Sequence, residues 1–284
     1  KELFAYLVDR NGAVCSNGEI IAALWDDDGD HYSYLKKCKK DLSRGGNEMI
    51  ETSEISKSFG NIKAVDNISL SIKEGNVFGL IGTNGAGKST FMRMLAGILR
   101  PDKGSVLIDG IPVYESEEAK RKFFYISDEQ FFLLNATPKD MGNFYKNFFA
   151  EFDEKKYVDC LEKFSLDSRR KINTFSKGMK KQLSILLGIC SGTKYILCDE
   201  TFDGLDPVMR QGIKSMFAKE MEERGLTPII ASHNLRELED ICDCVGVLHQ
   251  GGVLMQKDLE EMKLNIHTIQ CVFSNQSDEE QLLQ

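Results

Sequence analysis

Hydrophobic residues recur with two different periods along this 284-residue chain, and each period predicts a different kind of element. Alternation through residues 50–72 predicts strands of a small antiparallel subdomain, with turns at Phe59-Gly60-Asn61 and at Asp66-Asn67. Short continuous apolar runs instead predict buried strands, at residues 77–81, 195–198 and 227–230. Because helical patterns separate these runs, the chain is predicted to be an α/β protein.

Helical spacing of apolar positions occupies the segments between those runs. It predicts a helix at residues 90–96, several helices within about residues 131–175, and a helix that starts at Pro207. The last of these helices is expected to turn an apolar stripe to the core, formed by Val208, Ile213, Phe217 and Met221. Residues 245–255 are predicted to form a closing hairpin.

One segment between a predicted strand and a predicted helix fits the phosphate-binding pattern G-x-x-x-x-G-K-[ST] at every fixed position. It consists of Gly82, Thr83, Asn84, Gly85, Ala86, Gly87, Lys88 and Ser89. Thr90, the next residue, is also expected to contact the nucleotide. The glycines let backbone N–H groups point at phosphates before a helix. Lys88 is expected to reach the β- and γ-phosphates, and the Ser89 hydroxyl to hold Mg²⁺. The alternative is a glycine-rich turn that binds nothing.

Two acids, Asp199 and Glu200, end the predicted strand that starts at Tyr195. Such a strand would deliver both carboxylates to the edge of the sheet where ligands bind. Asp199 is predicted to hold Mg²⁺, directly or through water, and Glu200 to polarise an attacking water. The alternative for Glu200 is a capping carboxylate beside Asp199.

Three further segments complete a fixed order around these acids. They are Phe175-Ser176-Lys177-Gly178-Met179-Lys180-Lys181-Gln182 upstream, and Asp203-Gly204-Leu205-Asp206 and Ala231-Ser232-His233 downstream. Together with the phosphate loop, they resemble the ATP-binding-cassette ATPases over roughly residues 50–256. The resemblance identifies residues 176–182 with the signature motif, residues 203–206 with the D-loop and His233 with the switch histidine.

The resemblance implies a P-loop NTPase cassette with a small antiparallel β subdomain and an inserted helical subdomain at about residues 131–175. In this family two cassettes dimerise head to tail, so Ser176 and Gly178 would contact the γ-phosphate of the partner's ATP. His233 would contact the γ-phosphate of its own subunit. The implied cofactors are ATP and Mg²⁺. The implied partners are a second ATPase subunit, identical or not, and a separate transmembrane permease.

The inserted subdomain carries many aromatic residues, among them Phe131, Phe132, Phe144, Tyr145, Phe148, Phe149 and Phe164. In the family this subdomain bears the groove for the permease's cytoplasmic coupling helix. The competing interpretation is a plain aromatic core, which we expect for most of these side chains.

Several positions depart from the family pattern or stay open. Lys177 and Met179 replace the residues that are commonest in the signature, and Thr201 stands where proline is usual. Phe59 is the best match for the aromatic residue that stacks on adenine, with a core phenylalanine as the alternative. The glutamine that senses Mg²⁺ and the permease corresponds either to Asp128, by its position after the strand, or to Gln130, by residue type.

Composition narrows the function. A net charge of −8 argues against broad attraction to nucleic acid. No apolar run approaches the roughly 20 residues of a membrane-spanning helix, so transport would need a separate membrane chain. Eight cysteines without a second zinc-like pair fit free thiols in a reducing compartment. We therefore expect a cytoplasmic protein, held at the inner face of the cell membrane through its permease.

The ends of the chain are expected to lie outside the cassette, which is assigned to residues 49–256. Residues 1–48 are expected to form a short helical appendage that resembles the helical part of a bacterial winged-helix regulator, or else to be a fusion segment. Residues 257–284 suggest a truncated accessory segment.

Taken together, these patterns predict the ATP-hydrolysing subunit of a bacterial transporter, with export as the expected direction. The alternatives are a soluble cassette ATPase acting on ribosomes or nucleic acid, and an ATP-gated regulator that uses the amino-terminal segment. The expectation of export comes from the resemblance to the family, and no motif in the chain identifies the transported compound.

Overall fold

The computed structural model describes residues 49–202, 204–234, 238 and 241–258. The expectations for residues 1–48, for Asp203 and for residues 259–284 lie outside this part of the chain. No helix in the described part combines the length and apolar character needed to cross a membrane.

A four-stranded antiparallel sheet, in the order β2-β1-β4-β5, confirms the predicted β subdomain. Its strands are β1 (Met49–Phe59), β2 (Ile62–Lys73), β4 (Lys103–Ile108) and β5 (Ile111–Pro112). The predicted turn at Phe59-Gly60-Asn61 joins β1 to β2. The predicted break at Asp66-Asn67 is wrong, because β2 runs on through it with shifts of register against β1. Asn67 has a φ of 52° there, so the polar pair marks an irregularity inside a strand.

A six-stranded sheet, in the order β10-β9-β3-β8-β7-β6, holds the predicted buried strands. These strands are β3 (Phe78–Ile81), β6 (Phe123–Ile126), β7 (Tyr195–Asp199), β8 (Thr227–Ser232), β9 (Cys244–His249) and β10 (Gly252–Asp258). All neighbours are parallel except β9 and β10, which form the predicted closing hairpin. Every residue of β7 is buried, which explains its continuous apolar sequence.

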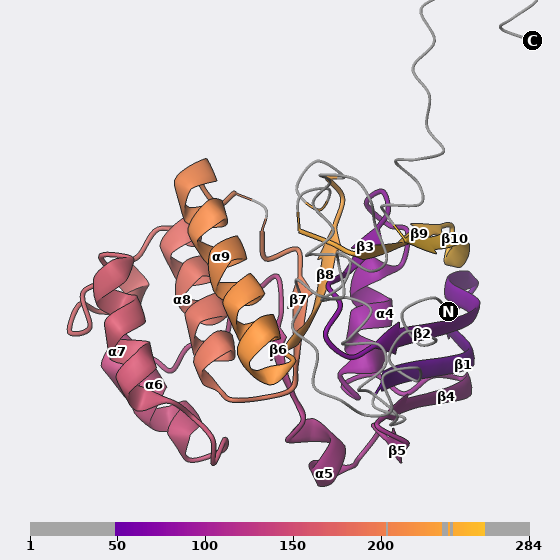
Figure 1. The fold of residues 1–284 in the computed structure, drawn as a ribbon. Coiled ribbons are helices and arrows are strands. Elements are labelled where there is room, and N and C mark those ends of the chain that lie inside the picture. The colour runs from indigo at the N-terminus through magenta and orange to yellow at the C-terminus, as the bar shows by residue number, and fades with distance from the viewer. Residues whose placement is uncertain (1–48, 203, 235–237, 239–240, 259–284) are drawn as a thin grey trace, which may run out of the picture. The chain divides into compact units, whose positions relative to one another are not determined.

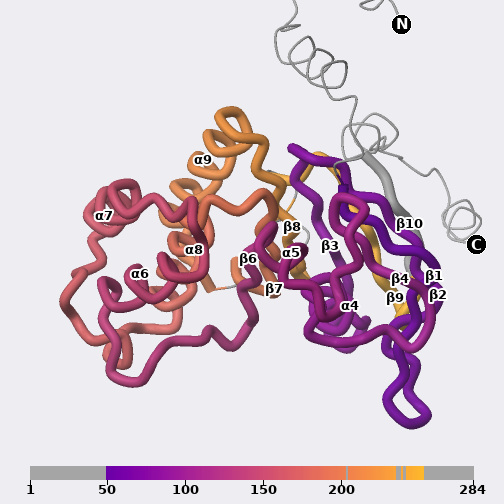
Figure 2. The backbone as a smooth tube through the Cα atoms, turned by 90° about the horizontal axis from the view of Figure 1, so that it is seen from below, coloured from indigo at the N-terminus to yellow at the C-terminus, as the bar shows by residue number. Residues whose placement is uncertain are grey.

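Helices cover both faces of the six-stranded sheet, and successive residues of β7 point to opposite layers. Tyr195 and Leu197 pack with α4 (Lys88–Leu95) and the inner face of the antiparallel sheet. Ile196 and Cys198 pack into the other core, with α8 (Lys177–Cys190) and α9 (Pro207–Arg224). Both views place the antiparallel sheet at one end and the inserted helices at the other (Figures 1 and 2).

The inserted helices are α6 (Pro138–Lys146), α7 (Glu154–Lys163) and the short 3-10 helix η1 (Ile172–Thr174); a further short helix, α5 (Glu117–Lys120), precedes β6. Thr137 and Asp140 form a capping box at the start of α6, and Asp153 caps α7. Five of the aromatic residues are partly buried against the core, as expected: Phe132, Phe144, Tyr145, Phe149 and Phe164. The expectation fails for Phe131 and Phe148, which are 61% and 60% exposed.

The apolar stripe of α9 is confirmed in part. Ile213 and Phe217 are buried and Met221 packs at the edge of the core. Val208 is wrong as a member of the stripe, since it is 82% exposed. It lies five positions before Ile213, and at 100° per residue that spacing turns it roughly 140° away from the stripe.

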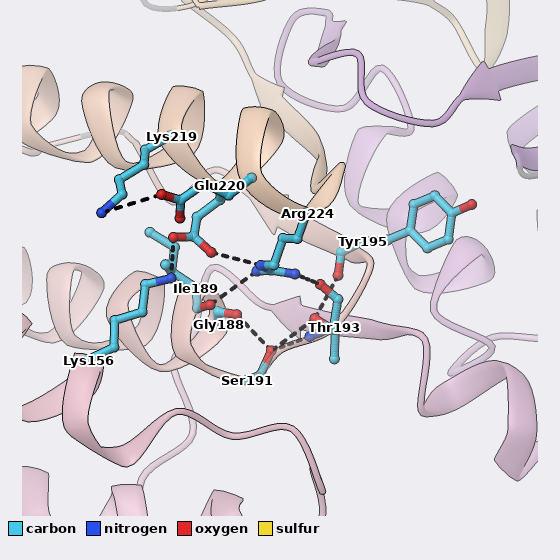
Figure 3. A network of polar contacts seen from close by, with 10 residues as sticks. Lys156, Gly188, Ile189, Ser191, Thr193, Tyr195, Lys219, Glu220 and Arg224 are labelled. Carbon is cyan, nitrogen blue, oxygen red and sulfur yellow. Dashed lines mark hydrogen bonds and ion pairs between the residues drawn. The ribbon is translucent and has the colours of Figure 1, made fainter. Parts of the chain in front are cut away.

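A network of polar contacts joins α7, α8 and α9 (Figure 3). The Glu220 carboxylate of α9 pairs with Lys156 of α7, and its other oxygen accepts from Arg224 Nε at 2.7 Å. Arg224 also donates to the carbonyl oxygens of Thr193 and of Ile189, the latter at 3.1 Å. The guanidinium thereby satisfies carbonyls at and just beyond the C-terminus of α8, which have no partner within the helix.

Candidate active site

The residues predicted to act on ATP follow strands that lie side by side. In the six-stranded sheet β8 has β3 on one side and β7 on the other. The phosphate loop follows β3, Glu200 follows β7, and His233 follows β8. These strands are parallel, so their carboxyl ends meet at one edge of the sheet. The topology thus gathers the predicted catalytic residues in one place.

The phosphate loop occupies the connection between β3 and α4, and Lys88, Ser89 and Thr90 form the first turn of α4. Gly85 and Gly87 have φ angles of 82° and 101°, in the left-handed region that other residues rarely adopt. A Cβ on Gly87 would also overlap the carbonyl oxygen of a residue in β2. Gly87 is the N-cap and gives α4 no side-chain cap, an arrangement that suits an anion at the first N–H groups.

Lys88 is held inside the loop that it closes. Its side chain is 3% exposed, and its ammonium is 3.2 Å from Glu200 Oε1. The ammonium also donates to the carbonyl oxygens of Gly82, at 2.8 Å, and Thr83, at 3.2 Å. A compact cation therefore lies where the phosphate loop meets the end of β7.

Each carboxylate oxygen of Asp199 accepts a hydrogen bond from a hydroxyl group. Ser89 Oγ donates to Oδ1 at 3.0 Å, and the Tyr125 hydroxyl donates to Oδ2 at 3.3 Å. Burial raises the pKa of Asp199 above its ordinary value, although these two hydrogen bonds oppose the shift. Burial, with the nearby Asp199 charge, also raises the pKa of Tyr125.

The oxygens of Ser89 and Asp199 fit Mg²⁺, which prefers hard oxygen ligands. The described residues contain no cluster of three or more His, Cys, Asp or Glu side chains able to hold a metal ion. Mg²⁺ in nucleotide sites is usually bound by one or two protein groups, with waters and phosphate oxygens completing its shell. The donor set here corresponds to that arrangement and would suit a metal that arrives with a nucleotide.

Glu200 lies at the centre of the site and has an unusual backbone. Its second carboxylate oxygen, Oε2, is 3.9 Å from His233 Nδ1. Its φ is 50°, and its N–H donates to the carbonyl oxygen of Ala231 at 3.0 Å. Its own carbonyl oxygen accepts from the ammonium of Lys181 at 2.7 Å. Both peptide groups of this residue are therefore fixed by neighbours from other segments.

The signature residues lie at the start of α8. Ser176 is the N-cap and accepts a hydrogen bond from the Met179 N–H at 3.2 Å. A Cβ on Gly178 would lie 3.5 Å from the carbonyl oxygen of Gly204, so this turn adjoins the predicted D-loop. In the described residues no hydrogen bond joins Ser176 or Gly178 to the phosphate loop.

Phe59 ends β1 with 49% of its surface exposed, so its alternative as a core residue is wrong. The Lys57 ammonium lies 5.9 Å from the centre of its ring. An exposed ring at the tip of a hairpin can offer one face to a planar ligand. Its assignment to adenine stays a prediction.

The two candidates in the loop after β6 lie in different surroundings. Asp128 is exposed and its Oδ1 is 3.7 Å from the Lys181 ammonium. The Gln130 side chain folds back, and its amide donates to the carbonyl oxygens of Ser127, at 3.3 Å, and Asp128. Within the described residues neither side chain bonds to Ser89 or Asp199, so both assignments stay predictions.

Two residues of the site were not identified from the sequence. Tyr125 lies in β6, just before the loop that contains Asp128 and Gln130, and its hydroxyl donates to Asp199. Lys181 lies inside the signature segment, but its contact with Glu200 bridges 19 residues of sequence. For Tyr125, the sequence offers one indication: a phenol that precedes a loop expected at the nucleotide site. For Lys181, no local pattern indicates a contact with Glu200.

Comparison with known proteins adds relatives to this geometry. Residues 65–203 match the family model described as ABC transporter. The chain is 30% identical over 225 residues to the ABC transporter ATP-binding protein YtrB of Bacillus subtilis, covering 79% of this chain and 77% of that protein. It is 32% identical to the linearmycin resistance ATP-binding protein LnrL of Bacillus subtilis, covering 72% and 68%. It is 29% identical to the bacitracin transport ATP-binding protein BcrA of Bacillus licheniformis, covering 76% and 71%.

Solved structures share the fold. An ATP-binding subunit of an ABC transporter superposes with a TM-score of 0.69 at 25% identity, covering 76% of this chain and 92% of that one. A dimeric ATP-binding cassette bound to ADP and Pi superposes with a TM-score of 0.66 at 24% identity, covering 74% and 99%. The predicted α/β cassette is thus confirmed, whereas nothing supports a winged-helix origin for residues 1–48.

Proposed function

This chain belongs to the ATP-binding proteins of ABC transporters, and from that premise we propose how its own residues hydrolyse ATP. As the ATPase subunit it couples hydrolysis to transport. The observation that carries the proposal is the meeting of Lys88, Asp199, Glu200 and His233 at one edge of the parallel sheet.

The triphosphate would lie across the N-terminus of α4. Backbone N–H groups of residues 82–90 would bind its oxygens, and the Lys88 ammonium would move from its loop carbonyls to the β- and γ-phosphates. The exposed ring of Phe59 would stack on the base. These contacts would bring the γ-phosphate next to Glu200 and His233.

Hydrolysis then needs a water in line with the bond between the γ-phosphorus and ADP. The water oxygen attacks phosphorus, its proton passes to the Glu200 carboxylate, and the electrons of the broken bond leave with ADP. His233 would donate to a γ-phosphate oxygen and so stabilise the charge that develops there. Its distance of 3.9 Å from Glu200 lets both side chains face the same phosphate.

Mg²⁺ would be held by the Ser89 hydroxyl and the Asp199 carboxylate, whose oxygens already lie 3.0 Å apart. The ion supplies neutralisation of charge on the phosphate oxygens. Tyr125 orients the second Asp199 oxygen through its hydroxyl. Asp128 and Gln130 remain candidates for a contact with the metal's waters from the loop after β6.

Two cassettes would complete each ATP site. The start of α8 presents Ser176, as N-cap, and Gly178, and among the described residues no hydrogen bond joins either of them to the chain's own phosphate loop. A helix N-terminus favours an anion, so this surface suits the γ-phosphate bound to a second subunit. We assign that subunit to another ABC ATPase, either a second copy of this chain or a homologue.

The inserted helices would receive the membrane permease. Side chains exposed on this region form an apolar surface, with exposures of 61% at Phe131, 92% at Leu134 and 60% at Phe148. The ring of Phe144 links Phe131 and Phe148 into one cluster. Such a surface fits a short cytoplasmic helix of a permease, which would hold this subunit at the inner face of the membrane.

We assign the direction of transport as export. The similar proteins named for bacitracin transport, linearmycin resistance and lantibiotic transport support this assignment, since removal of an antibiotic from the cell is one way to resist it. A methionine import ATP-binding protein is also similar to this chain, so the direction must be tested with the chain and its permease together. ATP-driven accumulation of cargo in inverted vesicles containing both chains would support export, and loss of preloaded cargo would contradict it.

The central test of hydrolysis is Glu200→Gln. The amide cannot take the proton of water, so turnover should fall by roughly 10²–10⁴-fold while Mg²⁺-ATP still binds. Steady-state phosphate release measures the first effect and a nucleotide-induced rise in the unfolding temperature the second. The bound variant should also accumulate as a dimer in light scattering.

Glu223→Gln is the matched control, because Glu223 lies on the exposed side of α9 and pairs only loosely with Lys219, at 3.7 Å. It should keep normal turnover. Hydrolysis at the normal rate by Glu200→Gln would contradict the role of Glu200. A strictly monomeric variant at saturating Mg²⁺-ATP would contradict the shared site.

A further inference from the structure

Lys181 connects three segments that are distant in sequence. It belongs to α8, in the turn that follows the signature serine, and its side chain is only 14% exposed. Its ammonium lies 2.7 Å from the carbonyl oxygen of Glu200, just past β7. The same ammonium is 3.7 Å from Asp128 Oδ1, in the loop after β6. One cation thus contacts both the residue that would act on water and the loop beside it.

Glu200 depends on such a contact because of its backbone. A φ of 50° lies in the left-handed region, which is unfavourable for a residue with a Cβ and persists where surrounding groups hold it. Two hydrogen bonds do so: the N–H donates to Ala231, and the carbonyl oxygen accepts from Lys181. The first bond joins neighbouring strand ends, whereas the second comes from a side chain on another element.

The direction of the Glu200 carboxylate follows from that backbone. Its oxygens lie 3.2 Å from the Lys88 ammonium and 3.9 Å from His233 Nδ1. A rotation of the Glu200 peptide would swing the carboxylate away from both side chains. An error of about 1 Å in the position of a catalytic group can cost a large part of the rate.

We propose that Lys181 is a positioning residue for ATP hydrolysis, which holds the Glu200 backbone in the conformation that aims its carboxylate. Asp128 supports the ammonium from the loop after β6, so that a movement of this loop changes the hold on Glu200. The inference rests on the proposed function, since it assumes that Glu200 takes the proton of the attacking water. Lys181 acts through Glu200 and has no role of its own in the chemical step.

The test uses Lys181→Met, which keeps an unbranched side chain of similar length but removes the charge. For the full-length chain, kcat should fall by at least about tenfold while KM for ATP stays within about twofold, because nucleotide contacts are untouched. Lys181→Arg should recover most of kcat, since a guanidinium can also donate to a carbonyl and pair with Asp128. Lys146→Met, which breaks an exposed pair with Glu154, is the control and should leave kcat unchanged.

Rescue by arginine separates positioning from a general loss of folded protein, and thermal unfolding of each variant checks that the protein is folded. Near-normal kcat in Lys181→Met would overturn the proposal, as would a change confined to KM.

The decisive arm combines variants. In a Glu200→Gln background, Lys181→Met should lower the residual rate by less than about twofold, because residues that act as a unit are not additive. The same loss in both backgrounds would overturn the proposal while leaving the proposed function intact. Normal turnover in Glu200→Gln alone would instead contradict the proposed function.

The contribution of Asp128 has its own arm. Asp128→Asn should lower kcat in the otherwise unchanged chain and have no further effect in Lys181→Met, since the proposed link from Asp128 to Glu200 runs through the ammonium. An equal effect in the two backgrounds would overturn the link between the loop and Glu200.

Discussion

Asp199 and Glu220 are each 1% exposed, yet their carboxylates have opposite surroundings. Asp199, at the end of β7, accepts from the hydroxyls of Ser89 and Tyr125, and in the described part of the chain no lysine or arginine forms an ion pair with it. Glu220, on α9, pairs with both Lys156 and Arg224 (Figure 3).

The pKa values follow this contrast. Burial raises the pKa of Asp199, and neither its two hydroxyl partners nor the charge of Arg93 overcomes that effect. Burial would also raise the pKa of Glu220, but hydrogen bonds and charges from Lys156 and Arg224 outweigh it and hold the pKa below its ordinary value.

The comparison distinguishes a structural carboxylate from a functional one. A buried carboxylate whose cations come from the chain itself is already neutralised, and it joins elements of the fold. A buried carboxylate whose hydrogen bonds come from hydroxyls, with no cation in direct contact, can be neutralised by a cation that arrives with a ligand. By this criterion Glu220 is a structural carboxylate, and Asp199 fits the metal-binding role proposed for it.

The largest expected effect is that of Asp199→Asn on hydrolysis. If Asp199 holds Mg²⁺ as proposed, its loss removes several kcal/mol of transition-state stabilisation, so phosphate release should slow by about 10³-fold. Without nucleotide, the free energy of unfolding should stay the same or rise, because a poorly compensated buried charge has gone. Urea unfolding without nucleotide measures the second effect. A large loss of stability would show that Asp199 resembles Glu220 after all.

Glu220→Gln should give the reverse result. Removing one member of a buried ion pair leaves Lys156 and Arg224 without their carboxylate, at a cost of about 3 kcal/mol in the free energy of unfolding. The rate of hydrolysis per folded molecule should be unchanged, since the network contains none of the residues proposed to act on ATP. Urea unfolding with Glu223→Gln as the exposed control measures the difference. Equal stabilities for these two variants would contradict the role assigned to the network.

The smallest effect concerns pH. Because the pKa of Glu220 is lowered in the folded state, its stabilising effect is complete above the pKa of the unfolded chain. It is lost as the pH falls through the folded pKa, below the ordinary glutamate range. The difference in unfolding free energy between the wild type and Glu220→Gln should therefore shrink on acidification and be constant near neutrality. A difference that grows in acid would reverse the sign of the argument.

Local sequence was sufficient for the phosphate loop and for the strand ends. Gly85 and Gly87 are required by backbone geometry within a few residues, and the acids after Tyr195 follow from a continuous apolar run. Contacts between distant segments could not be predicted in this way. Lys156 meets Glu220 across 64 residues of sequence, and Lys181 meets Glu200 across 19. These pairs depend on how helices pack, which no local pattern encodes.

The errors of prediction have similar causes. Asp66-Asn67 has the composition of a turn, but pairing with β1 carries β2 through it with a shifted register. Val208 is apolar and stands near the start of α9, but its angle around the helix axis turns it to the outside. The sequence did not decide whether Phe59 is a core residue or an exposed one, because a hairpin tip contains both kinds of position. In each case strand pairing or the angle around the helix axis, rather than local composition, determined the conformation or exposure of the residue.

The present position of Lys88 also has a consequence for affinity. The ammonium that would bind the phosphates is already bonded to Glu200, so carboxylate and nucleotide compete for one cation. Arrival of ATP would then release Glu200 at the moment when its free carboxylate is needed. Because the pair competes with the nucleotide for Lys88, a change of Glu200 that weakens the pair should strengthen nucleotide binding, by at most the factor by which the pair is weakened. Glu200→Gln should therefore bind even ADP more tightly than the wild type, an effect that owes nothing to slower hydrolysis and that a titration with ADP would detect.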